Sequence, residues 1–171
     1  MTHLFETFST PFGRFSVAVD RDGALVATAF GERDSLLKRD RKNDVSRDPV
    51  ATRAVKAQVL AYFEGESRTF TLPLAPAGTS FQQSVWAALQ RIPFGETRSY
   101  GELAKDLGRP NASRAVGRAN ATNPICLVVP CHRVIGADGA LTGFAFGNEL
   151  KRRLLAHEKN GARGSNSRPH A

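Results

Sequence analysis

This 171-residue chain is short of cysteine and lacks any long apolar run. Its two cysteines, Cys126 and Cys131, lie five positions apart in one apolar segment, and nothing else in the chain would complete a zinc site of two cysteines and two histidines. No apolar stretch approaches the length of a membrane span. Residues 1–6 lack the basic and then apolar pattern of a secretory signal. We therefore expect a reducing, cytoplasmic setting without membrane association, in which a free thiol can work.

Positive charge is present in excess, and it is unevenly placed. Hydrophobic residues make up 41 % of the chain, enough for a sizeable core, and the formal net charge is +8. Residues 1–78 hold eleven Lys or Arg against ten Asp or Glu, whereas residues 79–160 hold eleven against six. Phosphate contacts are basic and independent of sequence, so the second half has the charge of a DNA-binding domain. Charge of this kind is also compatible with solubility alone.

The first 78 residues are expected to form an α/β domain. Short apolar runs alternating with turns predict strands at 4–8, 14–19 and 24–30, joined as hairpins. The charged stretch 31–48 predicts a short helix and then a solvated loop. Asp48 followed by Pro49 predicts the start of a helix over 49–63, and residues 69–72 are a candidate further strand. Pro73, Pro76 and Gly78 predict a linker.

Residues 79–160 are expected to be mainly helical. Capping boxes at Ser80–Gln83 and Ser99–Glu102 predict two helix starts. Gly108 would stop the second of these helices, and a third is expected over 112–121. Two short helices joined by a tight turn are typical of a helix-turn-helix, with the second as recognition helix. Residues 139–147 predict a loop, and a last helix is expected from Asn148 to about Glu158. Residues 161–171 are expected to be a disordered basic tail.

The segment with the most chemical content is 123–134, with the sequence NPICLVVPCHRV. The apolar run predicts a buried strand or strand-like segment that delivers Cys131 into the interior, with His132 and Arg133 behind it. A buried cysteine is usually inert, but a neighbouring base or positive charge favours the thiolate, which is the nucleophile. Adjacent residues on a strand point to opposite faces, so Cys131 and His132 would meet only through a water or a turn of the chain.

The chain resembles the methylated-DNA–protein-cysteine methyltransferases, also called O6-alkylguanine-DNA alkyltransferases. The resemblance extends from about Thr79 to Lys159 and is weaker in the first 78 residues. It is specific because separate motifs follow in order: Phe94-Gly95-Glu96, Ser99-Tyr100, Arg114-Ala115-Val116-Gly117, the Pro130-Cys131-His132-Arg133 segment and Leu154-Leu155-Ala156-His157-Glu158. It implies an RNase-H-like fold for the first domain and a winged helix-turn-helix in the second.

The resemblance also implies a reaction and its residues. An alkyl group would move from guanine O6 to Cys131, once and irreversibly, with the damaged nucleotide flipped out of double-stranded DNA. His132 would be the general base, reached through a water and oriented by Glu158. Tyr100 would assist the leaving guanine, and Asn123 would brace the recognition helix. Arg114 would fill the gap left by the flipped base, with binding through the minor groove. The remaining implied contacts are Ala115, Gly117 and Arg118 toward DNA, the carbonyls of Cys131 and Val134 toward the guanine amino group, and the Ala145 amide toward O6.

The chain departs from the family in its pocket loop. The family usually has Tyr where Phe144 stands, and commonly Gly at Phe146. Phe144 keeps a flat face for stacking, whereas Phe146 fills space at the mouth of the alkyl pocket. We expect methyl groups to be accepted and bulky groups such as benzyl to react poorly. Arg133 is expected to be structural or phosphate-facing, and Cys126 to be core.

No cofactor is implied, because the acceptor is the protein itself, and no metal, because some members carry zinc in the first domain but this chain has no cysteine there. A monomer is expected, with cooperativity on DNA and activity on O4-alkylthymine left open. Three alternatives remain: a winged-helix DNA-binding regulator, a cysteine hydrolase or thiol transferase, and a lesion sensor without transfer activity.

Overall fold

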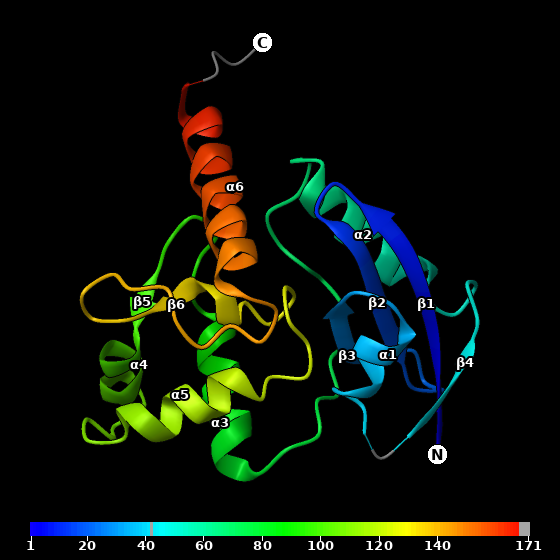
Figure 1. Ribbon diagram of the computed structural model, residues 1–171, viewed down its shortest axis with the longest axis horizontal. Coiled ribbons are helices and arrows are strands. Elements are labelled where there is room, and N and C mark those ends of the chain that lie inside the picture. The colour runs from blue at the N-terminus through cyan, green and yellow to red at the C-terminus, as the bar shows by residue number, and fades with distance from the viewer. Residues whose placement is uncertain (42, 168–171) are drawn as a thin grey trace. The chain divides into compact units, whose positions relative to one another are not determined.

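The computed structural model describes residues 1–41 and 43–167 and divides into two compact units (Figure 1). The first unit holds residues 1–79 together with 122–128, and the second holds 80–121 and 129–171. The linker predicted around Pro73–Gly78 therefore lies just before the division. No helix in the described part of the chain combines the length and apolar character that crossing a bilayer requires.

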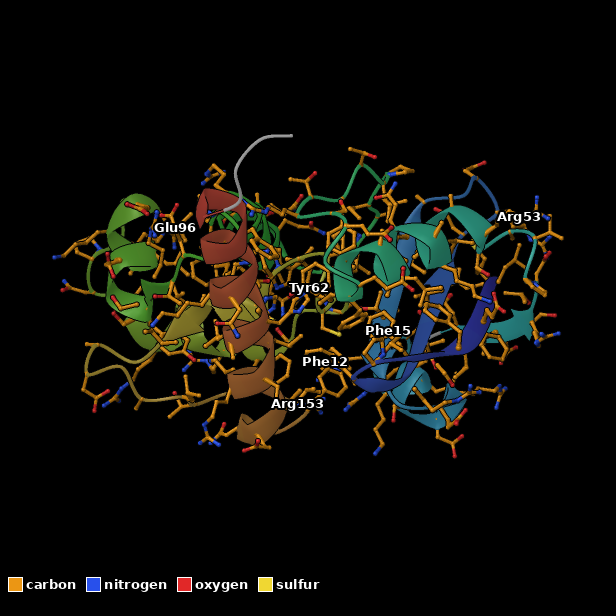
Figure 2. The ribbon with its side chains drawn as sticks, turned by 90° about the horizontal axis from the view of Figure 1, so that it is seen from above. Phe12, Phe15, Arg53, Tyr62, Glu96 and Arg153 are labelled. Atoms are coloured by element: carbon orange, nitrogen blue, oxygen red, sulfur yellow. The ribbon has the colours of Figure 1, made fainter. Side chains whose placement is uncertain are left out.

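The first unit is built on a four-stranded sheet in the order β3-β2-β1-β4. Strands β1 (Thr2–Thr10), β2 (Gly13–Val19) and β3 (Leu25–Phe30) form the antiparallel hairpins that the turns predict. Helix α2 (Arg53–Phe63) packs Phe63 against Phe15 of β2, with ring centroids 6.1 Å apart. Phe15 and Tyr62, both labelled in Figure 2, are fully buried in this core, whereas Arg53 at the start of α2 is exposed.

Three predictions for the first unit need correction. The stretch after α1 (Arg33–Leu37) is not only a loop: β4 (Asp44–Arg47) pairs in parallel with the start of β1. Only Val45 of β4 is buried, so its composition is that of a loop and tertiary pairing makes it a strand. Residues 69–72 form no strand, because Thr71 bonds to the Gln58 side chain instead. The helix predicted from residue 49 begins at Arg53, after a turn in which Asp48 caps two backbone amides.

The segment 122–128 belongs to the first unit rather than the second, and it is not a strand. Thr28 of β3 donates its amide to the Pro124 carbonyl at 2.9 Å and its hydroxyl to the Cys126 carbonyl at 2.7 Å. These bonds hold the segment along the edge of the sheet. Leu127 has φ 74°, in the left-handed region that side chains disfavour, so the backbone turns here instead of extending. Cys126 is buried, as a core residue is expected to be.

The second unit is mainly helical (Figure 1). It contains α3 (Ser80–Gln90), α4 (Tyr100–Asp106), α5 (Ser113–Ala121), the 3₁₀ turn η1 (Cys131–Arg133) and α6 (Asn148–Ser167), with β5 (Arg98–Ser99) pairing in parallel with β6 (Val134–Ile135). Ser99 and Glu102 form the predicted capping box at the start of α4. Helices α4 and α5 are packed together as the helix-turn-helix pattern requires. The winged form of that motif stays a prediction.

The predicted end of the last helix needs correction. Helix α6 does not end near Glu158 but continues to Ser167, so residues 161–167 are helical rather than disordered, and 168–171 lie outside the described residues. Gly161 would ordinarily favour a helix end. Here a Cβ at Gly161 would lie 3.1 Å from the Phe94 ring, so the glycine serves packing instead of stopping the helix.

Candidate active site

The 3₁₀ turn η1 places Cys131, His132 and Arg133 in the interior of the second unit. All three are buried, and His132 is completely shielded from solvent. Because the backbone turns here, these neighbours are not directed to opposite faces as they would be on a strand. The turn therefore removes the geometric objection to Cys131 and His132 acting together.

Glu158 of α6 organises this turn through four hydrogen-bond donors. Its carboxylate lies 2.7 Å from His132 Nε2 and accepts from Arg133 Nε at 2.8 Å and Nη2 at 3.0 Å. The Gly95 amide donates to it at 3.3 Å. Arg133 also donates to the Ile92 carbonyl at 2.7 Å, so this arginine is structural and does not face phosphate. The predicted pairing of Glu158 with His132 is present, and it includes Arg133.

The electrostatics of this cluster define the state of His132. Burial opposes the charge on Glu158, but the hydrogen bonds from His132 and the Arg133 guanidinium more than offset it and hold the pKa of Glu158 well below its usual range. Burial lowers the pKa of His132, against the attraction of Glu158. His132 is therefore neutral near pH 7, with its proton on Nε2 toward the carboxylate. Its Nδ1 is left as a proton acceptor, and this buried atom has no hydrogen-bond partner among the described residues.

Lys151 of α6 is a charged residue of this site that the sequence patterns did not single out. It is completely buried and donates to the carbonyls of Val134 and Thr142. It forms no ion pair with a carboxylate in the described part of the chain. Burial lowers the pKa of Lys151, and the charge that Cys131 carries as a thiolate opposes this. Its spacing offered a signal, because Lys151 and Glu158 both lie on the helical face of the buried Leu154.

Asn120 of α5 is a second residue of this site that the sequence patterns did not single out. It is buried, and its Nδ2 donates to the Cys131 carbonyl at 3.3 Å. The Val134 amide donates to the same carbonyl. A carbonyl oxygen has two lone pairs, so the guanine amino group predicted to bind the Cys131 carbonyl would share it with these donors. Position 120 stands four residues after the buried Val116, which could have indicated it.

The loop 136–147 lies next to Tyr100 in the same unit. The Tyr100 hydroxyl donates to the Thr142 carbonyl at 3.1 Å. A Cβ at Gly143 would come within 3.0 Å of that hydroxyl, and Gly143 has φ 72°, so only glycine fits. Phe144 is buried and meets the half-buried Phe146 edge to face at 5.6 Å. Ala145 is exposed.

The predicted DNA contacts lie on α5, and Asn123 belongs to the first unit. Arg114 and Arg118 are exposed on α5, and Ala115 and Gly117 are half-buried beside them. Asn123 is buried in the first unit, where its Oδ1 accepts the Ile125 amide at 3.0 Å. This bond is that of an ordinary Asx turn, so the bracing role of Asn123 stays a prediction.

Both halves of the chain match known protein-family models. Residues 4–76 match the family model described as 6-O-methylguanine DNA methyltransferase, ribonuclease-like domain, and residues 80–160 match the DNA-binding domain of the same enzyme. A methylated-DNA–protein-cysteine methyltransferase of Methanosarcina acetivorans is 46 % identical over 158 residues, covering 90 % of this chain and 97 % of the relative. The constitutive enzyme of Bacillus subtilis is 42 % identical, with 92 % and 96 % covered.

A solved structure gives the same answer at the level of the fold. The crystal structure of Mycobacterium tuberculosis OGT in complex with DNA superposes with a TM-score of 0.82 at 44 % identity, covering 92 % of this chain and 94 % of the other. The O6-methylguanine-DNA methyltransferase of Pyrococcus kodakaraensis is more distant, with a TM-score of 0.63 and 28 % identity. The two-part fold predicted from the sequence is therefore confirmed.

Proposed function

Since the chain belongs to the 6-O-methylguanine DNA methyltransferase family, we propose that Cys131 is the residue that accepts the alkyl group. The protein is a methylated-DNA–protein-cysteine methyltransferase and repairs DNA by direct transfer of the alkyl group to itself. The observation that supports Cys131 is its place in the turn whose next residue is bonded to a buried, ionised Glu158. No observation favours a regulator or sensor without transfer activity.

His132 supplies the base for this reaction. Its Nδ1 takes the thiol proton of Cys131 through a water, and Glu158 stabilises the imidazolium that results. The thiolate then attacks the alkyl carbon, so that an S–C bond forms as the bond from carbon to guanine O6 breaks. The electron pair remains on the guanine. Tyr100 lies at the carbonyl of Thr142 and would turn its hydroxyl from there to protonate or hydrogen-bond the guanine ring.

DNA is the partner, and its binding face is proposed to be α5. Arg114 and Arg118 are exposed cations on this helix. A Cβ at Gly117 would meet Tyr100 only at an ordinary 3.7 Å, so internal packing does not demand this glycine, whereas close approach of a DNA backbone would. We assign Arg114 to the gap left by a flipped O6-alkylguanine, with contact through the minor groove. We also propose a cytoplasmic monomer that needs no metal or cofactor.

Replacing Cys131 tests the acceptor directly. Parent protein is mixed with duplex DNA carrying one O6-methylguanine and examined by intact and peptide mass spectrometry. One added methyl on the Cys131 peptide, without further turnover, is expected. Cys131→Ala should gain no methyl and still bind the DNA, because the binding face is on α5. Cys126→Ala is the matched control and should react like the parent, since Cys126 lies in the core of the first unit. Methylation of the Cys131→Ala protein elsewhere would contradict the proposal.

Phe146 is expected to limit the size of the alkyl group. It stands edge to face against the buried Phe144 in the loop that is proposed to border the alkyl group. Phe146→Gly should raise the rate with O6-benzylguanine by about tenfold or more, since relief of a steric clash of this size exceeds about 1.4 kcal/mol. The rate with O6-methylguanine DNA should change little. Equal benzyl rates in parent and variant, measured by single-turnover kinetics, would show that Phe146 does not gate the pocket.

A further inference from the structure

Two buried side-chain atoms in the described part of the chain have no hydrogen-bond partner, and both adjoin the nucleophile. They are His132 Nδ1 and Asn120 Oδ1. His132 follows Cys131 directly, and Asn120 is bonded to the carbonyl of Cys131. Buried polar atoms are nearly always satisfied, so two exceptions on residues that adjoin Cys131 call for a functional explanation.

The orientation of the Asn120 amide follows from its neighbour. The Cys131 carbonyl can only accept, so the amide nitrogen must face it, which leaves the amide oxygen on the other side. That oxygen, like Nδ1 of neutral His132, is an acceptor without a donor. A leucine would fill the same volume without a buried unsatisfied group, so packing alone does not account for an asparagine here.

We propose that Asn120 is a positioning residue that holds the relay water between Cys131 and His132. The water donates one hydrogen to His132 Nδ1 and the other to Asn120 Oδ1, and its oxygen accepts the thiol hydrogen of Cys131. This satisfies both unpartnered acceptors with one molecule, whose two donors match them in number. The inference rests on the proposed function, in which His132 takes the proton of Cys131 through a water.

The proton transfer balances in this arrangement. The S–H bond of Cys131 breaks as its proton passes to the water, and the hydrogen that the water shares with His132 passes to Nδ1. The water is regenerated, and its bond to Asn120 Oδ1 is kept throughout. The products are a thiolate and an imidazolium. The imidazolium faces Glu158, and the thiolate lies in the field of Lys151, with Arg133 bonded to Glu158.

Asn120 is also anchored for this role. The carbonyl of the preceding residue, Ala119, accepts from the indole nitrogen of the buried Trp86 at 2.8 Å. This bond fixes the end of α5 against α3, so the Asn120 amide is held in place by packing as well as by its own bond. The helix assigned to DNA therefore carries, on its opposite buried face, a group that acts on the nucleophile.

The test uses Asn120→Leu, with Asn120→Met as a second variant in case leucine prevents folding, and Asn160→Leu on the exposed face of α6 as control. The first measurement is the rate of Cys131 alkylation by iodoacetamide as a function of pH, in DNA-free protein. The second is the single-turnover rate of methyl transfer from O6-methylguanine DNA. DNA affinity and the thermal midpoint complete the set.

Without the water's second anchor, the pH at which Cys131 alkylation is half-maximal should move upward by about one unit. Transfer should slow by about 10- to 100-fold, at or below the lower end of the roughly 100- to 10,000-fold that a general base contributes, because His132 itself remains. DNA affinity should stay within about twofold, and the thermal midpoint should change little, because the Cys131 carbonyl keeps the Val134 amide as a donor. An unchanged pH profile and transfer rate would overturn the inference, as would a loss confined to DNA affinity. If the parent itself transfers no methyl, the proposed function fails, and the iodoacetamide profile still tests Asn120 separately.

Discussion

Glu158→Gln is expected to destabilise the protein and nearly abolish methyl transfer. The parent carboxylate accepts from His132, from two nitrogens of Arg133 and from the Gly95 amide. A glutamine offers one acceptor oxygen and turns its amide hydrogens toward remaining donors. The buried Arg133 would then lack its counterion, which typically costs about 3–5 kcal/mol. Transfer should fall by about 100-fold or more, because His132 loses the group that orients it and stabilises its imidazolium.

Glu149→Gln is the matched control for this prediction. Glu149 lies in the first turn of the same helix, is exposed, and pairs with Arg152 at the surface. A surface pair of this kind contributes about 0–1 kcal/mol, so the control should unfold like the parent. Denaturant unfolding and single-turnover transfer rates measure both effects. If the Glu158→Gln protein is as stable and as active as Glu149→Gln, the buried cluster contributes neither to stability nor to methyl transfer.

The same carboxylate makes stability depend on pH in acid. The pKa of Glu158 is lowered in the folded protein, so its contribution is complete above the unfolded value of about 4.3 and is lost as pH falls below it. The unfolding free energy of the parent should therefore decline below about pH 4.3 more steeply than that of Glu158→Gln, which has no proton to gain at this position.

Lys151→Gln is expected to slow methyl transfer by about 100-fold near pH 7, the effect of losing one preorganised electrostatic group. Lys151 is a buried cation without a carboxylate partner in the described part of the chain. Burial lowers its pKa, and attraction to the Cys131 thiolate opposes that shift. Glutamine removes the charge but keeps a hydrogen-bond donor for Val134 or Thr142. Without the charge, alkylation of Cys131 by iodoacetamide should require a higher pH.

Lys151→Met and Lys159→Gln separate the causes. Methionine removes both the charge and the bonds to the two carbonyls, so it reports their combined effect. Its stability should change little, because the cost of burying an ammonium disappears together with those bonds. Lys159 is exposed on the same helix, so Lys159→Gln should leave both the transfer rate and the stability unchanged. If Lys151→Gln transfers as fast as the parent while Lys151→Met does not, the bonds and not the charge matter.

Local patterns in the sequence were sufficient for features that neighbouring residues determine. The capping box at Ser99 and Glu102 formed as predicted, since both partners lie within one helical turn. The hairpins of the first unit follow from turns and alternating apolar residues. Cys131 and His132 are joined by a peptide bond, so their adjacency in the chain is enough to single out the site. These features depend on short separations, over which sequence pattern and geometry are directly related.

Tertiary structure decided what depends on burial and on distant partners. From the sequence alone, Glu158 is expected to be an exposed glutamate on a helix. Only the packing of α6 on the η1 turn buries it against Arg133, 25 residues away. Lys151 and Asn120 become part of the site for the same reason, because the role of a polar residue on an apolar helix face depends on what that face packs against.

Segment 122–128 turns and joins the first unit because Thr28 supplies hydrogen bonds that its own residues lack. Gly161 continues a helix that it would end in isolation, since the Phe94 ring occupies the space of its missing side chain.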